Sequence, residues 1–555
     1  MKKRPGLWRN SCLLLLSLLV FIVAGCQALG GVDFNAMLKQ SLKVTSYEGS
    51  QLVEFKLLLK DNALADATDE EKAVLDLVSS VKLQLDHVMV AQAGAMSVKG
   101  KLSLGEKSIA FSAQLDDKLT VIDLEGAKRP IVIHMAGSAD LQDDDGLGIN
   151  DATEAKLTET AKQMMDVAGD YAIHNLPNPK HLSVNVGQEQ VAGETVSGMN
   201  IHAELTGIEL WDWAKSYVEA LLSDKDGLKE MLTQLLELVQ SQSDALKSTG
   251  AESIFGSLPE EEIDGESVQE ATDSVVEMLT ELKDGIAKTE LNDQEELNHI
   301  FTKDTYVKGD LFIDSKLDIR KSVIEASIKP NLAALDALAD KEAAAAAQET
   351  VAADGEEMLT AVNIGELEES APIEGLWLKV TSDRWNVNGN VMPDQPTAPR
   401  LSIDGEQLME MEGYEVLRNL EPDSVLYSLL REQGHISKQV ITMYAAYSAN
   451  PPIITPDGIT LIPLRRTVNG FHATIRKEAG TLVVYDDATG STLGMRTGSN
   501  HVTLNGKTVT WSFPPTVING VTYVPARDFV KALGGTLQWN TDDYEDDYLV
   551  ISREP

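Results

Sequence analysis

The sequence predicts an α+β protein in two parts: a large N-terminal region in which a curved antiparallel sheet packs on helices, and a small C-terminal α+β module made of two strand-helix-strand repeats. Three observations lead to this fold class. Apolar residues alternate in strand-like stretches, apolar stripes at helical spacing lie between them, and an eight-residue motif occurs twice near the C-terminus. A chain of 555 residues is long enough for roughly three to four domains.

The N-terminal segment is typical of an export signal. Four basic residues, the last of them Arg9, precede an apolar run at 12–23 that is too short to span a bilayer as a mature helix. The sequence Val23-Ala24-Gly25-Cys26 follows and resembles the lipobox of bacterial lipoproteins. The resemblance implies that residues 1–25 are a signal peptide. It also implies that Cys26, acylated with chains such as palmitate, anchors the protein at the extracytoplasmic face of the cell membrane. An ordinary secretory signal or an anchor helix is the alternative.

The acidic region, residues 26–440, begins with strands. Val53, Phe55, Leu57 and Leu59 occupy alternate positions, and similar alternation recurs downstream. We expect strands at 53–59, 81–86, 96–104, 108–115, 119–124, 182–186, 199–205, 311–319 and 323–328. The pattern leaves open whether this region is one domain or two.

Helices are expected between these strands. Thr206-x-x-Glu209 has the pattern of a capping box and precedes an apolar stripe that ends at Leu221. Two further helices are predicted at 228–239 and 268–282. Stripes of this kind indicate a packed core rather than a cofactor site. The succession of helices and a curved sheet resembles LolA-type lipoproteins, whose half-barrel holds acyl chains, and this resemblance implies a carrier of lipid or another apolar ligand.

The negative charge lies almost wholly in the N-terminal region. The chain has 47 Lys+Arg and 87 Asp+Glu, a net charge of −40, but residues 445–555 contain only nine basic and eleven acidic residues. Because nucleic acids are bound mainly through Lys and Arg, no nucleic-acid partner is expected. The change in composition coincides with Ser448-Ala449-Asn450-Pro451-Pro452, which predicts a linker at 441–452 and a separate module at 453–555.

The module contains an internal repeat. Residues 458–465, Gly-Ile-Thr-Leu-Ile-Pro-Leu-Arg, recur 62 positions later as residues 520–527, Gly-Val-Thr-Tyr-Val-Pro-Ala-Arg. Gly458 and Gly520 predict tight turns, and Pro463 and Pro525 suit the start of a helix after a short strand.

The two copies differ at the end of their helices. Gly534-Gly535 ends the second helix, whereas His472-Ala473 occupies the equivalent place in the first and leaves its helix end open. Arg465 and Arg527 occupy the same position in both copies. That equivalence favours an internal ion pair or carbonyl clamp over a site for an anionic ligand.

The paired motif resembles the copper amine oxidase N-terminal-like domain, also called the stalk domain, over roughly residues 450–553. The second copy continues as Asp528-Phe529-Val530-Lys531-Ala532-Leu533-Gly534-Gly535 and reaches Trp539, as the family pattern does. Such modules occur on exported proteins of Gram-positive bacteria. The resemblance implies a non-catalytic module for envelope attachment, spacing or protein interaction, with a cell-wall polymer or an envelope protein as its partner.

The resemblance does not extend to copper chemistry. The nine His residues form no His-x-His pair, and the sequence contains no Asn-Tyr-Asp/Glu motif. We therefore predict a protein that is not an enzyme, with no catalytic residue, no cofactor and no metal site. Acidic runs at 143–146 and 542–547 could bind Ca²⁺, but solvated acidic loops are the expected interpretation. The lipid carrier is the first alternative to this function, and a hydrolase of envelope polymers that uses a carboxylate pair is the second.

Overall fold

The computed structural model describes residues 34–60, 68–92, 94–135, 151–241, 265–335, 337–338, 373–542 and 546–555. The chain forms two compact units. The body comprises Met1–Leu124 and Pro130–Ser402, and the C-terminal unit comprises Glu125–Arg129 and Ile403–Pro555. The boundary therefore lies earlier than the expected linker at 441–452. Part of that linker is a strand, β13 (Gln439–Tyr444), that pairs with the last strand of the chain.

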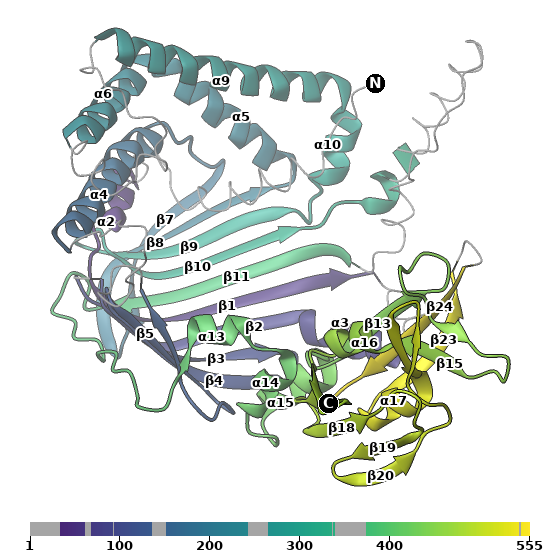
Figure 1. Cartoon of the computed structure of the whole chain (residues 1–555). Helices are drawn as coiled ribbons and strands as arrows, with labels where there is room; N and C mark the ends of the chain where they lie inside the picture. The colour runs from purple at the N-terminus through teal and green to yellow at the C-terminus, as the bar shows by residue number, and fades with distance from the viewer. Residues whose placement is uncertain are drawn as a thin grey trace, which may run out of the picture. The chain divides into compact units, whose positions relative to one another are not determined.

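The α+β prediction is confirmed, and the body is built on one antiparallel sheet (Figure 1). Its strands lie in the order β6-β5-β4-β3-β2-β1-β11-β10-β9-β8-β7. Their bounds are β1 (Tyr47–Leu59), β2 (Ser80–Val90), β3 (Met96–Leu104), β4 (Lys107–Leu115), β5 (Leu119–Leu124), β6 (Ile131–His134), β7 (His181–Val191), β8 (Glu194–Thr206), β9 (Tyr306–Asp314), β10 (Ile319–Ile328) and β11 (Ile373–Trp385).

β11 joins what would otherwise be two separate meanders. β1 to β6 pair in sequence order, and so do β7 to β10. β11 pairs antiparallel with β1 on one side and β10 on the other, for example through Val380, which lies opposite Val53 and Ile324. The sequence predicts no strand at 373–385, so this central element is found only in the structure.

The expected strand at 311–319 is wrong in its extent, because a turn divides it. β9 ends at Asp314 and β10 begins at Ile319. The Asp314 carboxylate accepts hydrogen bonds from the backbone N–H groups of Lys316 (2.8 Å) and Asp318 (3.2 Å), and Leu317 adopts a φ of 65°. An aspartate that caps its own turn outweighs the apolar alternation that continues through it.

Helices pack over one end of the sheet (Figure 1). Those predicted at 206–221, 228–239 and 268–282 are present as α5 (Ile208–Ser223), α6 (Lys225–Ser241) and α9 (Gly265–Asn292). The structure adds α2 (Phe34–Leu42), α3 (Asp69–Val78), α4 (Asp151–His174) and α10 (Gln294–Ile300), which the sequence analysis did not expect.

The start of α5 differs from the expected capping box. Gly207, with a φ of 52°, is the N-cap residue and makes no side-chain cap. The Glu209 carboxylate accepts hydrogen bonds from the backbone N–H and hydroxyl of Thr206, both at 3.3 Å. Of the two hydrogen bonds of a capping box, only the one accepted by Glu209 is formed. Glycine adopts a positive φ easily, so the N-cap position falls on Gly207, one residue after Thr206.

The C-terminal unit contains the two repeats and additional strands. The first repeat comprises β14 (Ile453–Ile454), β15 (Thr460–Pro463), α16 (Leu464–Gly470), β16 (Thr474–Glu478) and β17 (Thr481–Asp486); the second comprises β21 (Thr516–Ile518), β22 (Val521–Pro525), α17 (Ala526–Ala532), β23 (Thr536–Thr541) and β24 (Asp547–Arg553). The remaining elements are β12 (Ile403–Asp404), α13 (Gly405–Glu410), α14 (Gly413–Arg418), α15 (Val425–Ser428), a π-helical turn (Leu429–Gln433), β18 (Ser491–Met495), β19 (His501–Leu504) and β20 (Lys507–Thr510).

The two repeats pair with each other about a local two-fold axis. β15 and β22 are antiparallel, and Ile462 lies opposite Val524, its own equivalent in the second copy. Both residues are fully buried, and both belong to the core of the unit. The repeat in the sequence thus produces an interface in which each copy covers the apolar face of the other.

The helix of the first repeat ends like that of the second despite its different sequence. His472 adopts a φ of 53°, close to the 75° of Gly534. The following N–H groups make equivalent bonds, from Ala473 to the carbonyl of Val468 and from Gly535 to that of Val530. Histidine tolerates this left-handed conformation at some cost, so the missing glycine does not change the fold.

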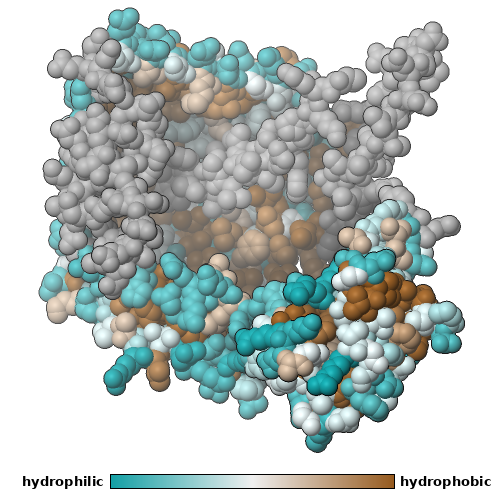
Figure 2. All heavy atoms as spheres, in the orientation of Figure 1, coloured by the Kyte–Doolittle hydropathy of each residue, from teal (hydrophilic) through white to brown (hydrophobic). Residues whose placement is uncertain are grey.

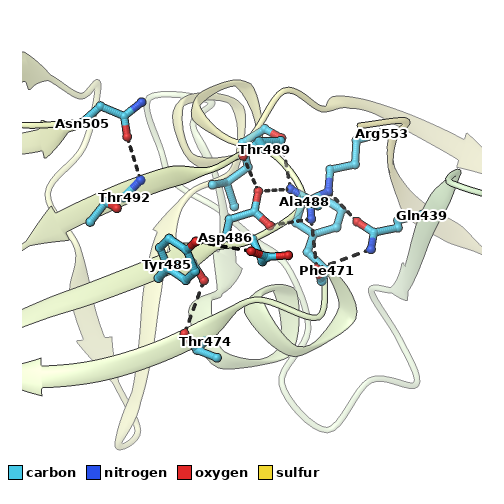
Figure 3. Close-up of polar contacts among 12 residues, drawn as sticks. Gln439, Phe471, Thr474, Tyr485, Asp486, Ala488, Thr489, Thr492, Asn505 and Arg553 are labelled. Atoms are coloured by element: carbon cyan, nitrogen blue, oxygen red, sulfur yellow. Dashed lines mark hydrogen bonds and ion pairs between the residues drawn. The ribbon is translucent and has the colours of Figure 1, made fainter. Parts of the chain in front are cut away.

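One buried ion pair connects the parts of the C-terminal unit (Figure 3). Arg553 contacts both carboxylate oxygens of Asp486, at 2.5 and 2.9 Å, and both side chains are 1% exposed. The guanidinium also donates to the carbonyls of Phe471 (2.9 Å) and Leu533 (3.2 Å) and to the side chain of Gln439 (2.6 Å). Phe471 and Leu533 are the C-cap residues of α16 and α17. A single side chain therefore satisfies a terminal carbonyl of each repeat helix.

We expect Arg553→Met to lower the opening free energy of the C-terminal unit by about 3–5 kcal/mol, because it leaves Asp486 buried and unpaired. Hydrogen-exchange mass spectrometry, which separates peptides of this unit from those of the body, measures the change. Arg418→Ala is the matched control, since the Arg418–Asp487 pair is half exposed and its loss should cost less than about 1 kcal/mol. Equal effects of the two substitutions would contradict the structural role of Arg553.

Candidate functional site

One face of the body sheet is apolar across nearly its whole width. On the central strands, Val53 and Phe55 of β1 lie opposite Val380 and Leu378 of β11, so all four side chains share this face. The register carries the pattern outward to both edges. The apolar residues on this face include Leu57, Leu83, Leu85, Leu102, Ile109, Phe111, Ile122, Leu182, Val184, Met199, Ile201, Leu205, Val307, Leu311, Ile324, Ile328 and Leu376.

The opposite face of the sheet is polar and charged. Glu54 pairs with Lys82 at 3.2 Å, and Glu325 with Lys308 at 3.1 Å. Burial acts to raise the pKa of Glu325, but hydrogen bonds from Tyr306, Trp377 and Lys308 outweigh it and hold that pKa below its usual value. Alternation along each strand therefore separates a charged, solvated face from an apolar one.

The helices cover only part of the apolar face. The buried core of the body joins α2, α4, α5, α9 and α10 to residues of β8, β9 and β10, with β7 packed at its margin. Among the described residues, this core includes none from β1 to β6 or from β11. Phe55, Leu57 and Leu378 remain partly exposed. Figure 2 shows apolar side chains on the floor of a hollow between the helices and the sheet.

A concave apolar surface that the described residues cover only in part suits a ligand held by burial rather than by directional bonds. Removal of apolar surface from water contributes about 25 cal/mol per Å², so a long hydrocarbon chain laid on this face would gain substantial free energy. The central positions around Phe55 and Leu378 carry no titratable side chain on this face. The arrangement favours binding of an apolar ligand over acid–base chemistry at these positions.

The structure describes the glycines and prolines of the repeat motif but not the predicted lipidation site. Cys26 and residues 1–25 lie outside the described residues. Gly458 and Gly520 adopt φ values of 77° and 81°, as turns require, and Pro463 and Pro525 are the N-cap residues of α16 and α17. The repeat residues thus have the structural places expected, except that each proline precedes the first helical residue.

The expected ion pair or carbonyl clamp at the repeat arginines is wrong. Arg465 and Arg527 are exposed, and neither makes a hydrogen bond or an ion pair in the part of the chain that the structure describes. Arg553 fills that role instead. It was missed because it lies outside the repeated motif, and only its position opposite Gln439 in the β13–β24 pairing brings it to both helix ends.

Five histidines in the described ranges pair with carboxylates. His202 lies 2.7 Å from Asp310, and His435 lies 3.1 Å from Glu554. No group of three or more His, Cys, Asp or Glu side chains that could hold a metal ion occurs among the residues with described positions. The acidic run at 143–146 is outside the described residues, as are positions 543–545 of the second run.

A pocket of about 380 Å³ between α2, α4 and α6 holds the acidic residues most relevant to the hydrolase alternative. Four carboxylates line it, and two of them, those of Asp170 and Asp224, are engaged in structural contacts. Asp170 pairs with Lys39 at 3.0 Å, while Asp224 accepts hydrogen bonds from Asn175 and from the backbone of Gly227. The geometry of this pocket gives the hydrolase alternative no support.

Three further findings bear on identity. Within the described residues, no helix has the length and apolar character needed to cross a membrane. No curated protein matches the chain. Residues 440–545 match the family model of the copper amine oxidase N-terminal domain, and the C-terminal region of this chain therefore contains a domain of that family.

Proposed function

We propose that the chain is an exported lipoprotein without catalytic activity, which holds an apolar ligand such as lipid acyl chains on the concave face of its body. The observation that carries the proposal is the apolar face, which continues over β1 to β5 and β11 beyond the helix-covered core. Soluble domains seldom leave a contiguous apolar surface open unless it binds something. The matched family model is that of an N-terminal domain only, and we assign the C-terminal unit to envelope attachment, spacing or protein interaction.

The proposed anchor is consistent with this function. Phe34, the first residue of α2, follows Cys26 by eight residues. Even fully extended, eight residues reach only about 30 Å. Acylation of Cys26 would therefore keep the body, and with it the apolar face, within a short distance of the membrane surface from which an acyl ligand could be taken.

We expect Cys26→Ala to release the protein from the membrane into the soluble or secreted fraction. The acyl chains that the Cys26 sulfur would carry through a diacylglyceryl group, which stabilise membrane binding by about 0.8 kcal/mol per buried CH₂, would be absent. Cell fractionation and immunoblotting measure the distribution. Cys12→Ala, within the signal run, is the control and should leave the protein in the membrane fraction. Retention of the Cys26→Ala protein in the membrane would rule out the lipid anchor.

We also expect native mass spectrometry to find a co-purifying lipid or fatty acid on the purified chain. Leu378→Asn, on the apolar face of β11, should weaken binding of that ligand by roughly tenfold, since a buried amide without partners costs about 1–3 kcal/mol. Lys379→Asn is the matched control, because the next residue on the same strand faces the opposite side.

The control substitution should leave ligand occupancy unchanged. Equal occupancy in both variants, with both folded by circular dichroism, would contradict an apolar site on this face. A purified chain that carries no ligand and takes up no fluorescent fatty acid would contradict the carrier function altogether.

A further inference from the structure

A groove of about 540 Å³ between the two repeats of the C-terminal unit carries two arginines of the first repeat. Its lining includes Asn450, Arg465, Arg466, Asn469, Ile475 and Leu482, together with the turn before β22. We propose that this groove binds phosphodiester groups of an anionic envelope polymer. The inference rests on the attachment role proposed above and names the residues and the ligand chemistry of that role.

The charge of the groove contrasts with that of the chain. No Asp or Glu lines it, although the chain carries a net charge of −40. Arg466 donates one hydrogen bond to the carbonyl of Thr442 at 3.1 Å. Arg465 is exposed and makes no hydrogen bond or ion pair within the described ranges. Two guanidinium groups therefore face a groove in which no carboxylate neutralises them.

The second repeat provides an internal comparison. Arg527 is the equivalent of Arg465, but Asp528 replaces Arg466 beside it. The Asp528 carboxylate accepts hydrogen bonds from the backbone N–H (2.8 Å) and hydroxyl (2.5 Å) of Ser512. The repeat architecture therefore needs neither a second arginine nor an open positive groove at this position. The Arg465–Arg466 pair is a feature of the first repeat alone.

The chemistry of the groove favours a phosphodiester polymer among anionic ligands. A planar guanidinium matches two oxygens of a phosphate, and two adjacent guanidinium groups can contact one or two phosphates along a chain. Ile475, Leu482 and Val521 line the same groove and are partly exposed, so they offer contacts to the carbon atoms of a polyol between phosphates.

The test is binding of the full chain to poly(glycerol phosphate), measured by isothermal titration calorimetry at several salt concentrations. We expect Arg465→Gln to weaken binding roughly tenfold and Arg465→Gln/Arg466→Gln to weaken it further, since each substitution removes charge-assisted hydrogen bonds to phosphate oxygens. The dependence of log K on log salt should also become shallower by roughly one to two with both arginines removed.

Arg527→Gln is the matched control and should change affinity less than about twofold, because its neighbour is Asp528 rather than a second arginine. Arg465 is exposed and unpaired in the described structure, so its substitution should not affect folding, and circular dichroism checks this for each variant. Poly-L-glutamate and phosphatidylglycerol vesicles separate phosphodiester binding from general anion binding and from binding to a membrane.

The proposal is overturned if poly(glycerol phosphate) does not bind, if Arg527→Gln weakens binding as much as Arg465→Gln, or if poly-L-glutamate binds as tightly as the polymer. Vesicles are tested with the Cys26→Ala chain, because acyl chains would insert into them by themselves; vesicle binding as tight as that of the polymer and lost with Arg465→Gln also overturns it. The measurements with the polymer and with poly-L-glutamate do not depend on acylation of Cys26 or on the apolar face of the body. A failure here would therefore leave the proposed anchor and ligand-binding face standing, and failure of those would leave this groove untouched.

Discussion

The buried pair of Arg553 and Asp486 is the interaction on which the C-terminal unit depends. Removing two charges from water costs several kcal/mol per ion, so such a pair persists only where its remaining donors and acceptors are satisfied. Here the guanidinium is bonded to the carboxylate, to the C-cap carbonyls of both repeat helices and to Gln439 of β13. Its ring contact with Phe471, at 4.0 Å, covers the flat face of the group. Because these partners come from both repeats and from the segment before them, the pair forms only when all three are in place.

β11 has the corresponding role in the body, although it acts through backbone pairing rather than charge. Without it, β1 and β10 would each be an unpaired edge strand of its own sheet. With it, the apolar positions of both meanders align in one register, because a shift by one residue would turn every side chain to the other face. The continuous apolar face is therefore a consequence of a strand that lies far from β1 in the sequence.

The sequence predicts local structure well and long-range pairing poorly. Strands at 96–104 and 119–124 are found with the predicted bounds, because alternation and hairpin turns are local properties. The turn at Asp314 was missed because the alternation of apolar residues continues through it. The hydrogen bonds of the Asp314 side chain that form the turn leave no mark on that alternation. The pairing of β1 with β11 and the contact of Arg553 with Asp486 join residues far apart in the chain, and one sequence contains no signal for such distances. The repeat was an exception, because its two copies share a motif and also pair directly through Ile462 and Val524.

The confinement of negative charge to the body would let an acidic chain combine an apolar face, left partly uncovered by the described residues, with the proposed attachment to an anionic polymer. An uncovered apolar surface promotes association between molecules, and Val186, on the edge strand β7, is 88% exposed. A large negative charge opposes that association through mutual repulsion. Repulsion would act equally against anionic polymers, so contact with them requires a surface where the local charge is reversed. The Arg465–Arg466 groove supplies such a surface in the near-neutral part of the chain. The arginine pair occurs in one repeat alone, because the local two-fold pairing allows one copy to diverge while the other keeps the fold.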